Sequence, residues 1–345
     1  MCFRFFIFKV LEIRRLLRLL SLHWCMRFIF VSILGRLTRG IASSTFHSLN
    51  YCQELSMHST KYTTEEFGCL YGLDYRIYFK ENGSYISPWH DIPLFADRSK
   101  KIYNMVVEIP RWTNAKMEMA TKESMSPIKQ DVKKGLPRFV DNIFPFKGYI
   151  WNYGAIPQTW EDPSHIDPVT EACGDNDPID VFEIGSKIHH RGAVIQVKIL
   201  GIIALIDEGE TDWKIVAIDS KDKMANEVNC IGDVEKHFPG LLKASYEWFR
   251  NYKIPTGKPP NQFGFDGLFK DADFAHDIVQ ETHKFWKQLM KQQSPLLNTE
   301  TRTCSGAAYP ADENAWCGIV SKQPQHGNEK NIPKEELDKW HFIKE

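Results

Sequence analysis

The sequence has 345 residues, 43% of them hydrophobic, which is enough for one substantial core or two modest ones. Its 43 basic and 44 acidic residues nearly balance, so overall charge does not indicate a nucleic-acid binder. No repeat is visible at solenoid periods, which excludes a repeat architecture.

The first 48 residues differ from the rest in charge. They contain seven Arg and one Lys but a single acid, Glu12, among many Leu, Ile and Phe. An Arg-rich, acid-poor segment that ends near a Ser/Thr cluster is typical of a mitochondrial transit peptide, which predicts delivery to the mitochondrial matrix. A secretory signal or a membrane anchor is the alternative. The longest apolar stretch, Phe28–Gly35, is well short of the roughly 20 residues that a span needs, so we expect no membrane span.

Between residues 74 and 219 the chain has a succession of strand patterns. Seven segments are rich in β-branched and aromatic residues: "DYRIYFK", "IYNMVVEI", "AKMEM", "PRFVDNIF", "DVFEI", "AVIQVKILGIIALI" and "WKIVAID". Helical periodicity appears only later, in Gly240–Lys253 and in Asp271–Met290, with Asp271 placed as an N-cap. Strands followed by helices predict an α+β, mainly β domain over residues 49–293. We expect an antiparallel barrel, because closing the sheet leaves no exposed strand edges.

The chain becomes polar and irregular from about Ser294 onward. This composition buries little apolar surface to offset the entropy lost on ordering. It predicts a mobile C-terminal tail over residues 294–345, with a short anchored turn at Trp340–Phe342.

The segment "GDNDPIDVFEI" concentrates three aspartates within six residues. Pro178 favours an extended conformation at Asp177. A strand that begins nearby places Asp180 and Phe182 on one face, so Asp180 would lie at the mouth of the barrel if Phe182 points inward. A buried carboxylate is costly unless it is paired or bound to metal, and a divalent cation relieves the repulsion between Asp175 and its neighbours.

A second acidic group lies in "LIDEGETDWKIVAI". Asp207 ends an apolar strand, Gly209 permits a tight turn, and Asp212 and Lys214 begin the next strand on one face. Two acid-tipped strands at one barrel mouth would form a cage of oxygen ligands, which hard Mg²⁺ prefers. Either group alone is more often a solvated loop, and an EF-hand is excluded because its turn Gly and distant Glu are missing.

Basic and tyrosine side chains are interleaved with these acids. Lys116 and Glu118 share one face of a predicted strand, Arg138 begins another, and Tyr252 and Lys253 end a helix. Singly these are ordinary surface ions or core aromatics. Together with the acids they form the donor set that binds and polarises a compact polyphosphate.

Five segments of the chain resemble the soluble (family I) inorganic pyrophosphatases of eukaryotes, in register from about Tyr75 to Leu289. They are "VVEIPRWTNAKMEM", "FPFKGYIWNYGAIPQTWEDP", "GDNDPIDVFEIG", "ALIDEGETDWKIVAID" and "WFRNYKIPTGKPPNQFGF". The Arg-rich leader and the ending "WHFIKE" are most similar to the mitochondrial form. The resemblance implies a five-stranded OB-type barrel with flanking helices, a homodimer, and three to four Mg²⁺ ions at each active site.

The resemblance also implies roles for individual residues. The ligands of a tightly bound metal pair match Asp175, Asp180 and Asp212. The ligands of a metal ion that arrives with pyrophosphate match Asp207 and Asp212. A contact to a further ion matches Glu118. Asp177 matches the group that deprotonates the attacking water. Phosphate contacts match Lys116, Arg138, Tyr153, Lys214, Tyr252 and Lys253. Tyr149 and Glu108 match supporting positions, and Glu161 an acidic position that lines the site. We therefore expect Asp177, Tyr149 and Arg138 to take part in catalysis.

This assignment agrees with the physical reasoning, because two metal ions that share a water lower its pKa, and Asp177 can act as general base. Two departures from the family pattern are small. Pro137 precedes Arg138 and removes a backbone donor, which could shift Arg138 slightly, and Phe146 and Lys147 replace His.

Three other functions remain open at this stage. A related nucleotide or polyphosphate hydrolase is one, although the sequence lacks a P-loop. A non-catalytic OB module that binds single-stranded nucleic acid would need basic and aromatic residues where this site has aspartate. A scaffold that has lost activity is the third, but every matched catalytic position holds a competent residue.

Overall fold

The computed structural model describes residues 61–292 and 296–344. The predicted transit peptide, residues 1–48, lies outside the described residues. No helix in the described part of the chain is long and apolar enough to cross a membrane.

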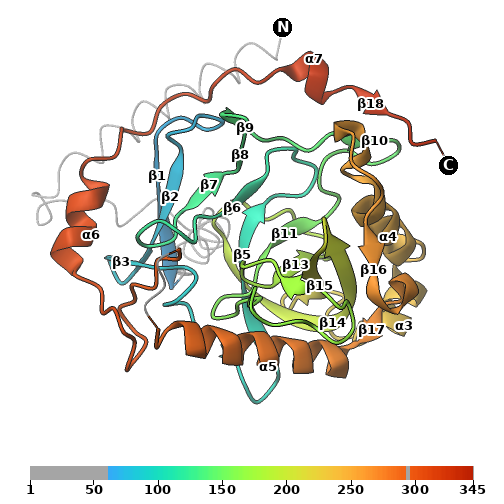
Figure 1. Ribbon diagram of the computed structural model, residues 1–345, viewed down its shortest axis with the longest axis horizontal. Coiled ribbons are helices and arrows are strands. Elements are labelled where there is room, and N and C mark those ends of the chain that lie inside the picture. The colour runs from blue at the N-terminus through green and yellow to red at the C-terminus, as the bar shows by residue number, and fades with distance from the viewer. Residues whose placement is uncertain (1–60, 293–295, 345) are drawn as a thin grey trace, which may run out of the picture. The chain divides into compact units, whose positions relative to one another are not determined.

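Strands predominate in the described residues (Figure 1). They are β1 (Tyr62–Phe67), β2 (Arg76–Glu81), β3 (Ser84–Ile86), β4 (Phe95–Asp97), β5 (Ile102–Ile109), β6 (Met117–Met119), β7 (Ile128–Gln130), β8 (Val132–Lys133), β9 (Leu136–Pro137), β10 (Asn142–Ile143), β11 (Asn152–Ala155), β12 (Cys173–Gly174), β13 (Asp180–Glu183), β14 (Val194–Asp207), β15 (Glu210–Asp219), β16 (Gln262–Phe263), β17 (Lys270–Asp271) and β18 (Trp340–His341). The helices are α3 (Ile231–His237), α4 (Leu241–Asn251), α5 (Ala272–Leu289), α6 (Glu313–Val320) and α7 (Lys334–Leu337), with 3₁₀ turns η2 (Ile254–Thr256) and η3 (Gly264–Gly267).

Five strands close into a ring. β5 pairs with β11 and β14, β11 with β13, β13 with β15, and β15 with β14. All these pairings are antiparallel except that of β13 with β15, which is parallel. The predicted mainly β, α+β fold is confirmed, and the five-stranded barrel is present as this closed ring.

The ring depends on one close backbone approach between β11 and β5. A Cβ atom on Gly154 would lie 1.9 Å from the carbonyl oxygen of Val106, so no other residue fits there without moving a strand. The pairing register of β11 and β5 shifts between Tyr153 and Gly154. The glycine and the register shift therefore bring Tyr153 and β5 together at one end of the ring.

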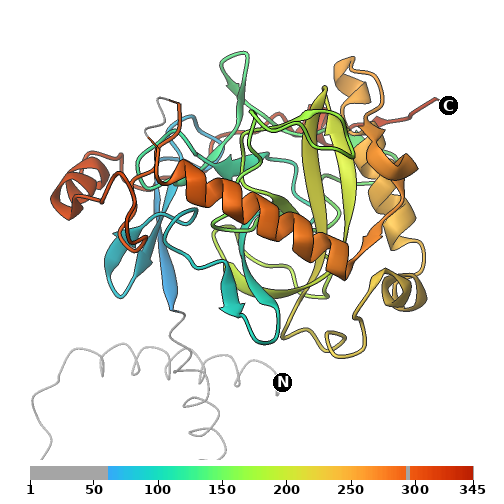
Figure 2. The same cartoon turned by 60° about the horizontal axis from the view of Figure 1, so that its bottom comes forward.

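Two amphipathic helices pack on the ring. The side chain of Asp271 caps α5 by accepting a hydrogen bond from the Phe274 amide at 2.9 Å, as the sequence predicts. α5 runs along the ring (Figure 2) and buries Ile278 among its apolar side chains. α4 packs the ring of Phe249 on Trp151, with centroids 4.9 Å apart. Because α4 ends at Asn251, its last turn delivers Tyr252 and Lys253 to the edge of the ring.

Most predicted strands are present, and β5 has the predicted bounds. The segment "PRFVDNIF" is an exception, because only Leu136–Pro137 and Asn142–Ile143 are strands and residues 138–141 are not. The β8–β9 hairpin closes just before these residues, with the Arg138 amide donating to the Asp131 carbonyl at 2.7 Å, so the chain turns away instead of extending. The sequence analysis missed β11, whose "NYGA" lacks β-branched residues.

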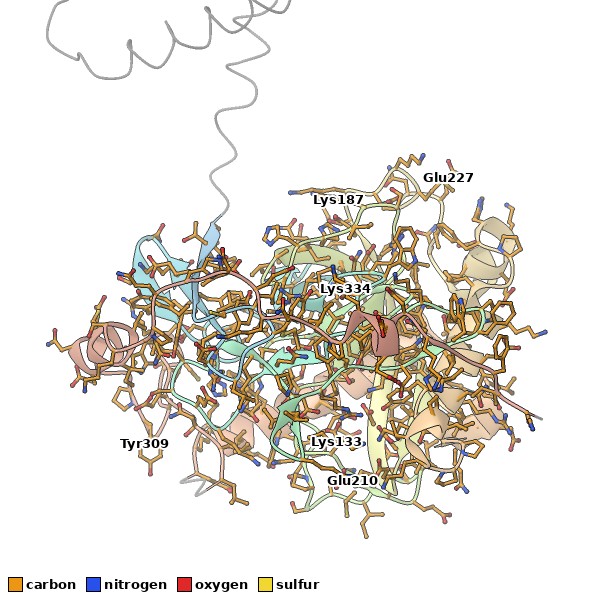
Figure 3. The ribbon with its side chains drawn as sticks, turned by 90° about the horizontal axis from the view of Figure 1, so that it is seen from above. Lys133, Lys187, Glu210, Glu227, Tyr309 and Lys334 are labelled. Carbon is orange, nitrogen blue, oxygen red and sulfur yellow. The ribbon has the colours of Figure 1, made fainter. Side chains whose placement is uncertain are left out.

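The structure differs from the prediction of a mobile tail. Residues 296–344 pass around the domain (Figures 1 and 3) and carry α6, α7 and β18. Trp316 of α6 is 1% exposed and packs with Tyr78 and Met125 beside the small sheet of β1, β2, β3, β6 and β7. An anchored turn was expected at Trp340–Phe342, and the structure instead has the short strand β18, which pairs with β10. A few buried side chains thus fix a segment whose average composition is polar.

Replacing Trp316 by Ala should lower the free energy of unfolding by about 3–5 kcal/mol, because the substitution leaves a cavity in this cluster. Chemical denaturation followed by circular dichroism measures the change, with Leu268→Ala as the control, since the Leu268 side chain is 66% exposed. Equal stability of Trp316→Ala and the parent protein would mean that α6 is not docked.

Candidate active site

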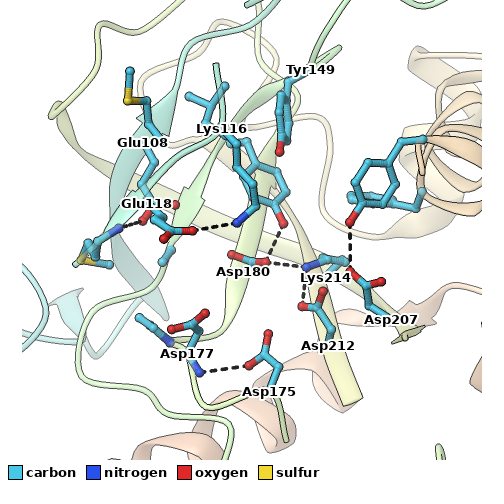
Figure 4. Close-up of a pocket in the computed structure, with 18 of the residues that line it drawn as sticks. Glu108, Lys116, Glu118, Tyr149, Asp175, Asp177, Asp180, Asp207, Asp212 and Lys214 are labelled. Atoms are coloured by element: carbon cyan, nitrogen blue, oxygen red, sulfur yellow. Dashed lines mark hydrogen bonds and ion pairs between the residues drawn. The ribbon is translucent and has the colours of Figure 1, made fainter. Parts of the chain in front are cut away.

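Charged side chains gather in one pocket between the ring and the C-terminal end of α4 (Figure 4). Seven carboxyl groups and four cationic side chains line it. The acids are Glu108, Glu118, Asp175, Asp177, Asp180, Asp207 and Asp212, and the cations are Lys116, Arg138, Lys214 and Lys253. Tyr149, Tyr153 and Tyr252 complete the polar lining. Every sequence-predicted site residue lines this pocket except Glu161, whose carboxylate lies within 4.8 Å of those of Asp175 and Asp212.

The loop before β13 is fixed by its own hydrogen bonds. The Asp177 amide donates to the Asp175 carboxylate at 3.0 Å, and Asn176 takes a left-handed conformation with φ of 74°. The loop backbone also pairs with Glu161, whose amide donates to the Asp177 carbonyl at 2.9 Å. These bonds aim Asp175 toward β15 and leave Asp177 partly exposed at the mouth of the pocket.

Three acids form a candidate metal centre. Carboxylate oxygens of Glu161, Asp175 and Asp212 lie within 4.8 Å of one another. One oxygen of Glu161 accepts from the Trp213 amide at 2.9 Å, and its other oxygen is buried without a hydrogen-bond partner. Burial, reinforced by Asp175 and then Asp212, raises the pKa of Glu161 well above its usual range. Clustered carboxylates with an unsatisfied buried oxygen fit a hard divalent cation.

The pKa values of the other two acids also rise. Burial, with the charges of Asp212 and Asp177 next, raises the pKa of Asp175 well above the usual range. Burial raises the pKa of Asp212 to about 7, although Lys214 acts in the opposite direction. Without a bound cation, too little positive charge lies nearby to stabilise all three carboxylates in their ionised form.

Lys214 bridges Asp180 and Asp212. Its amine forms ion pairs with both carboxylates, and the Tyr153 hydroxyl donates to Asp180 at 2.5 Å. Burial alone would lower the pKa of Lys214, but the two carboxylates raise it well above its usual value. The predicted ligand trio of Asp175, Asp180 and Asp212 is thus in one pocket, while the tight carboxylate group has Glu161 in place of Asp180.

Asp207 marks the other side of the pocket. It accepts a hydrogen bond from the Tyr252 hydroxyl at 2.9 Å and forms an ion pair with Lys253. Lys253 also contacts Glu208 at 3.0 Å. Burial, with Asp207 next, raises the pKa of Tyr252 well above its usual value, so its hydroxyl stays protonated and donates.

The sequence analysis missed Asp131. This carboxylate accepts from the Arg138 guanidinium at 2.9 Å and lies 3.8 Å from the Lys116 amine, which also pairs with Glu118 at 2.8 Å. Asp131 and Arg138 flank a Lys-Lys-Gly turn that brings them together, and this turn is the sequence signal that could have identified Asp131. Pro137 does not displace Arg138 from the pocket.

Glu108 and Tyr149 lie deep in the pocket. Glu108 accepts from the Met119 amide at 2.7 Å, and burial, with Asp180 next, raises its pKa well above the usual range. The Tyr149 ring lies 4.9 Å from Trp248 and 5.1 Å from Tyr153, and burial raises its pKa to about 12.

Asp177 is exposed, whereas the other acids that line the pocket are buried or partly buried. Loss of hydration inside the pocket, reinforced by Glu118, raises its pKa to about 7, although part of the residue is exposed at the mouth. A carboxylate with this pKa can take up a proton near neutral pH.

Comparison with known proteins gives consistent results. The family described as inorganic pyrophosphatase matches residues 105–287. The chain is 60% identical over 285 residues to inorganic pyrophosphatase 1 of Caenorhabditis elegans, which covers 83% of this chain and 66% of that protein. It is 53% identical over 282 residues to inorganic pyrophosphatase of Homo sapiens, covering 81% and 97%.

Solved structures agree. The fold is similar to that of inorganic pyrophosphatase from Schistosoma japonicum, with a TM-score of 0.76 and 46% identity, covering 81% of this chain and all of that one. It is also similar to a truncated Trypanosoma cruzi vacuolar soluble pyrophosphatase in complex with PPi, with a TM-score of 0.63 and 39% identity, covering 78% and 100%.

Replacing Glu161 by Gln should weaken Mg²⁺ binding by roughly tenfold or more, because ligand charge sets the affinity of such sites. Gln keeps the acceptor for the Trp213 amide, so the fold should be retained. Isothermal titration without substrate measures the affinity. Glu183→Gln is the control, since Glu183 is equally buried but accepts from the backbone amides of Gly185 and Asp219 outside this pocket. Equal Mg²⁺ affinity for Glu161→Gln and the parent would remove Glu161 from the metal centre.

Proposed function

This chain belongs to the family of soluble (family I) inorganic pyrophosphatases, and on that premise we propose that its acidic pocket hydrolyses inorganic pyrophosphate to two phosphates with Mg²⁺ as cofactor. The observation that carries the proposal is the carboxylate group of Glu161, Asp175 and Asp212, of which Asp175 and Asp212 line the same pocket as the four cations. The carboxylates can bind metal ions, and the lysines and the arginine can bind a compact anion. A phosphate substrate that carries metal ions interacts with both sets of side chains.

Three to four Mg²⁺ ions would be held by the acids. The proposed ligands of a metal pair are Asp175, Asp180 and Asp212, with Glu161 beside them. An ion that accompanies pyrophosphate would bind Asp207 and Asp212, and a further ion would bind Glu118. When bound, Mg²⁺ supplies charge neutralisation and makes water easier to deprotonate.

The protein's own groups perform the rest of the reaction. Asp177, at the mouth and with its pKa near 7, accepts the proton of the attacking water. Lys116 and Arg138 on one side, and Lys214 and Lys253 on the other, bind phosphoryl oxygens with the help of Tyr153 and Tyr252. Tyr149 supports them as a neutral hydroxyl donor. No step needs a covalent intermediate.

Substrate identity is tested by measuring phosphate release from pyrophosphate and from ATP, with Mg²⁺ and with a chelator. We expect fast, Mg²⁺-dependent release from pyrophosphate and little from ATP. Preferential release from ATP would instead favour a nucleotide hydrolase, and no release from folded protein would favour a scaffold that has lost activity.

Replacing Asp177 by Asn should reduce kcat by about 10²–10⁴-fold, because the general base is lost while the metal ligands remain. Mg²⁺ affinity should stay unchanged, as measured by titration. Asp277→Asn on α5, an exposed Asp outside the pocket, is the control and should keep full activity. Unchanged turnover in Asp177→Asn would exclude the general-base role.

We also propose a homodimer. Phe144, Trp340 and Phe342 form an exposed aromatic cluster with centroids 5.3 and 5.6 Å apart, and Phe342 is 70% exposed. An apolar cluster of this kind favours burial against a second copy. Analytical ultracentrifugation should show a dimer that Phe342→Glu dissociates, and a monomeric parent protein would contradict the proposal.

Delivery to the mitochondrial matrix, as for the mitochondrial form of the family, is proposed from the Arg-rich composition of residues 1–48. These residues fused to a fluorescent protein should direct it to mitochondria, and a cytosolic signal would contradict the proposal.

A further inference from the structure

One buried amide joins the segments that supply phosphate-binding side chains. Asn142 of β10 is 2% exposed and lies four residues after Arg138 and seven before Tyr149. The hydrogen bonds of its side chain go to Asn114, Gly148 and Leu337, and not to the acids of the metal centre. Its own bonds run instead to the backbone and side chains that hold the cationic side of the pocket.

The carbonyl oxygen of the Asn142 side chain accepts two hydrogen bonds. One comes from the Asn114 side chain at 2.7 Å, and the other from the Gly148 amide at 2.9 Å. Asn114 lies two residues before Lys116, and Gly148 directly precedes Tyr149. A single oxygen therefore ties the Lys116 strand to the Tyr149 turn.

Asn114 extends this connection to Arg138. The Asn114 side chain also donates to the Val140 carbonyl at 2.9 Å, and the Val140 amide donates to the Asn114 carbonyl at 2.8 Å. Lys116 in turn donates its amide to the Arg138 carbonyl at 3.1 Å. The three segments form one hydrogen-bonded unit around Asn142.

The turn at Gly148 leaves little room for movement. A Cβ atom on Gly148 would lie 2.4 Å from the Thr113 carbonyl oxygen, and the Gly148 carbonyl accepts from the Trp248 indole at 2.8 Å. The turn is thus pressed against the Asn114 segment on one side and α4 on the other.

The nitrogen of the same side chain faces the C-terminal part of the chain. It donates to the carbonyl of Leu337, the last residue of α7. Residues 334–343 are called here the C-terminal strap and include α7 and β18. β18 pairs with β10, and the Phe144 amide donates to the His341 carbonyl at 2.9 Å. Since the nitrogen has an acceptor and the oxygen two donors, only one orientation of the amide satisfies all three partners.

We propose that Asn142 is a positioning residue for pyrophosphate binding, whose amide is oriented by the C-terminal strap and holds the Lys116, Arg138 and Tyr149 segments in register. Side chains that bind a compact anion must be placed to a fraction of an ångström, and loss of this unit would let three of them move together. The inference rests on the proposed pyrophosphatase function of the pocket.

Two substitutions in the full chain separate the two halves of the proposal. Asn142→Ala removes every bond of the side chain. Asn142→Asp keeps acceptors for Asn114 and Gly148 but places a carboxylate against the Leu337 carbonyl, so it breaks only the bond to the strap. Asn104→Ala is the matched control, because Asn104 is 6% exposed and donates to the Pro93 carbonyl at 2.7 Å, outside the pocket.

The readouts are KM for pyrophosphate at saturating Mg²⁺, inhibition by inorganic phosphate, Mg²⁺ affinity without substrate, and the unfolding midpoint. For Asn142→Ala we expect KM and the inhibition constant of phosphate to rise by about tenfold or more, with Mg²⁺ affinity unchanged. For Asn142→Asp we expect a smaller rise in the same direction. Asn104→Ala should lower the unfolding midpoint without changing KM.

Three results would overturn the inference. An unchanged KM in Asn142→Ala would exclude the positioning role. A rise in KM together with weaker Mg²⁺ binding, if Asn104→Ala shows the same two changes, would indicate general destabilisation instead. A KM for Asn142→Asp equal to that of the parent would exclude orientation by the strap. If the parent chain itself does not hydrolyse pyrophosphate, the proposed function fails instead, which separates the two cases.

Discussion

The main constraint on this structure is that the negative charges of several neighbouring, largely buried carboxylates must be compensated by cations. Glu161, Asp175 and Asp212 repel one another where water is scarce, and desolvation raises the pKa of each. The ring provides part of the compensation through register, because parallel pairing of β13 with β15 sets Asp180 opposite Lys214. Lys214 pairs with both Asp180 and Asp212, and its single positive charge cannot also neutralise Asp175 and Glu161. The site therefore needs cations from solution.

The fold holds the carboxylates and the cations of the site in fixed positions, and this placement favours metal and anion binding. Two of the three acids are held by backbone amides, since Asp175 accepts from the Asp177 amide and Glu161 from the Trp213 amide. Rigid placement keeps repulsion high in the absence of metal and makes metal binding favourable. Lys214 lies on β15, Lys253 follows the end of α4, and Lys116 and Arg138 directly adjoin β6 and β9, so a compact anion meets a preformed set of donors.

Much of this arrangement could be predicted from the sequence. Alternation in "WKIVAID" and "DVFEI" indicated strands with charged ends, and β5 and the Asp271 cap have the predicted positions. The pairing of β11 with β5 could not be predicted, since it depends on one glycine that admits a distant carbonyl. The proximity of Glu161 to Asp175, and of Asp131 to Arg138, likewise depends on how loops return to the ring. The contacts of residues 296–344 could not be predicted either, because average polarity does not register a few buried side chains such as Trp316.

Whether the acids of this pocket bind divalent cations can be seen directly in a crystal structure of the protein soaked in Mn²⁺, with anomalous scattering used to locate the ions. We expect at least one strong anomalous peak within ligand distance of Asp175 and Asp212, with Lys214 displaced from one of its two carboxylates. No peak at this pocket at saturating Mn²⁺, or peaks only at surface carboxylates, would show that the acid cluster is stable without the cation that it is proposed to bind.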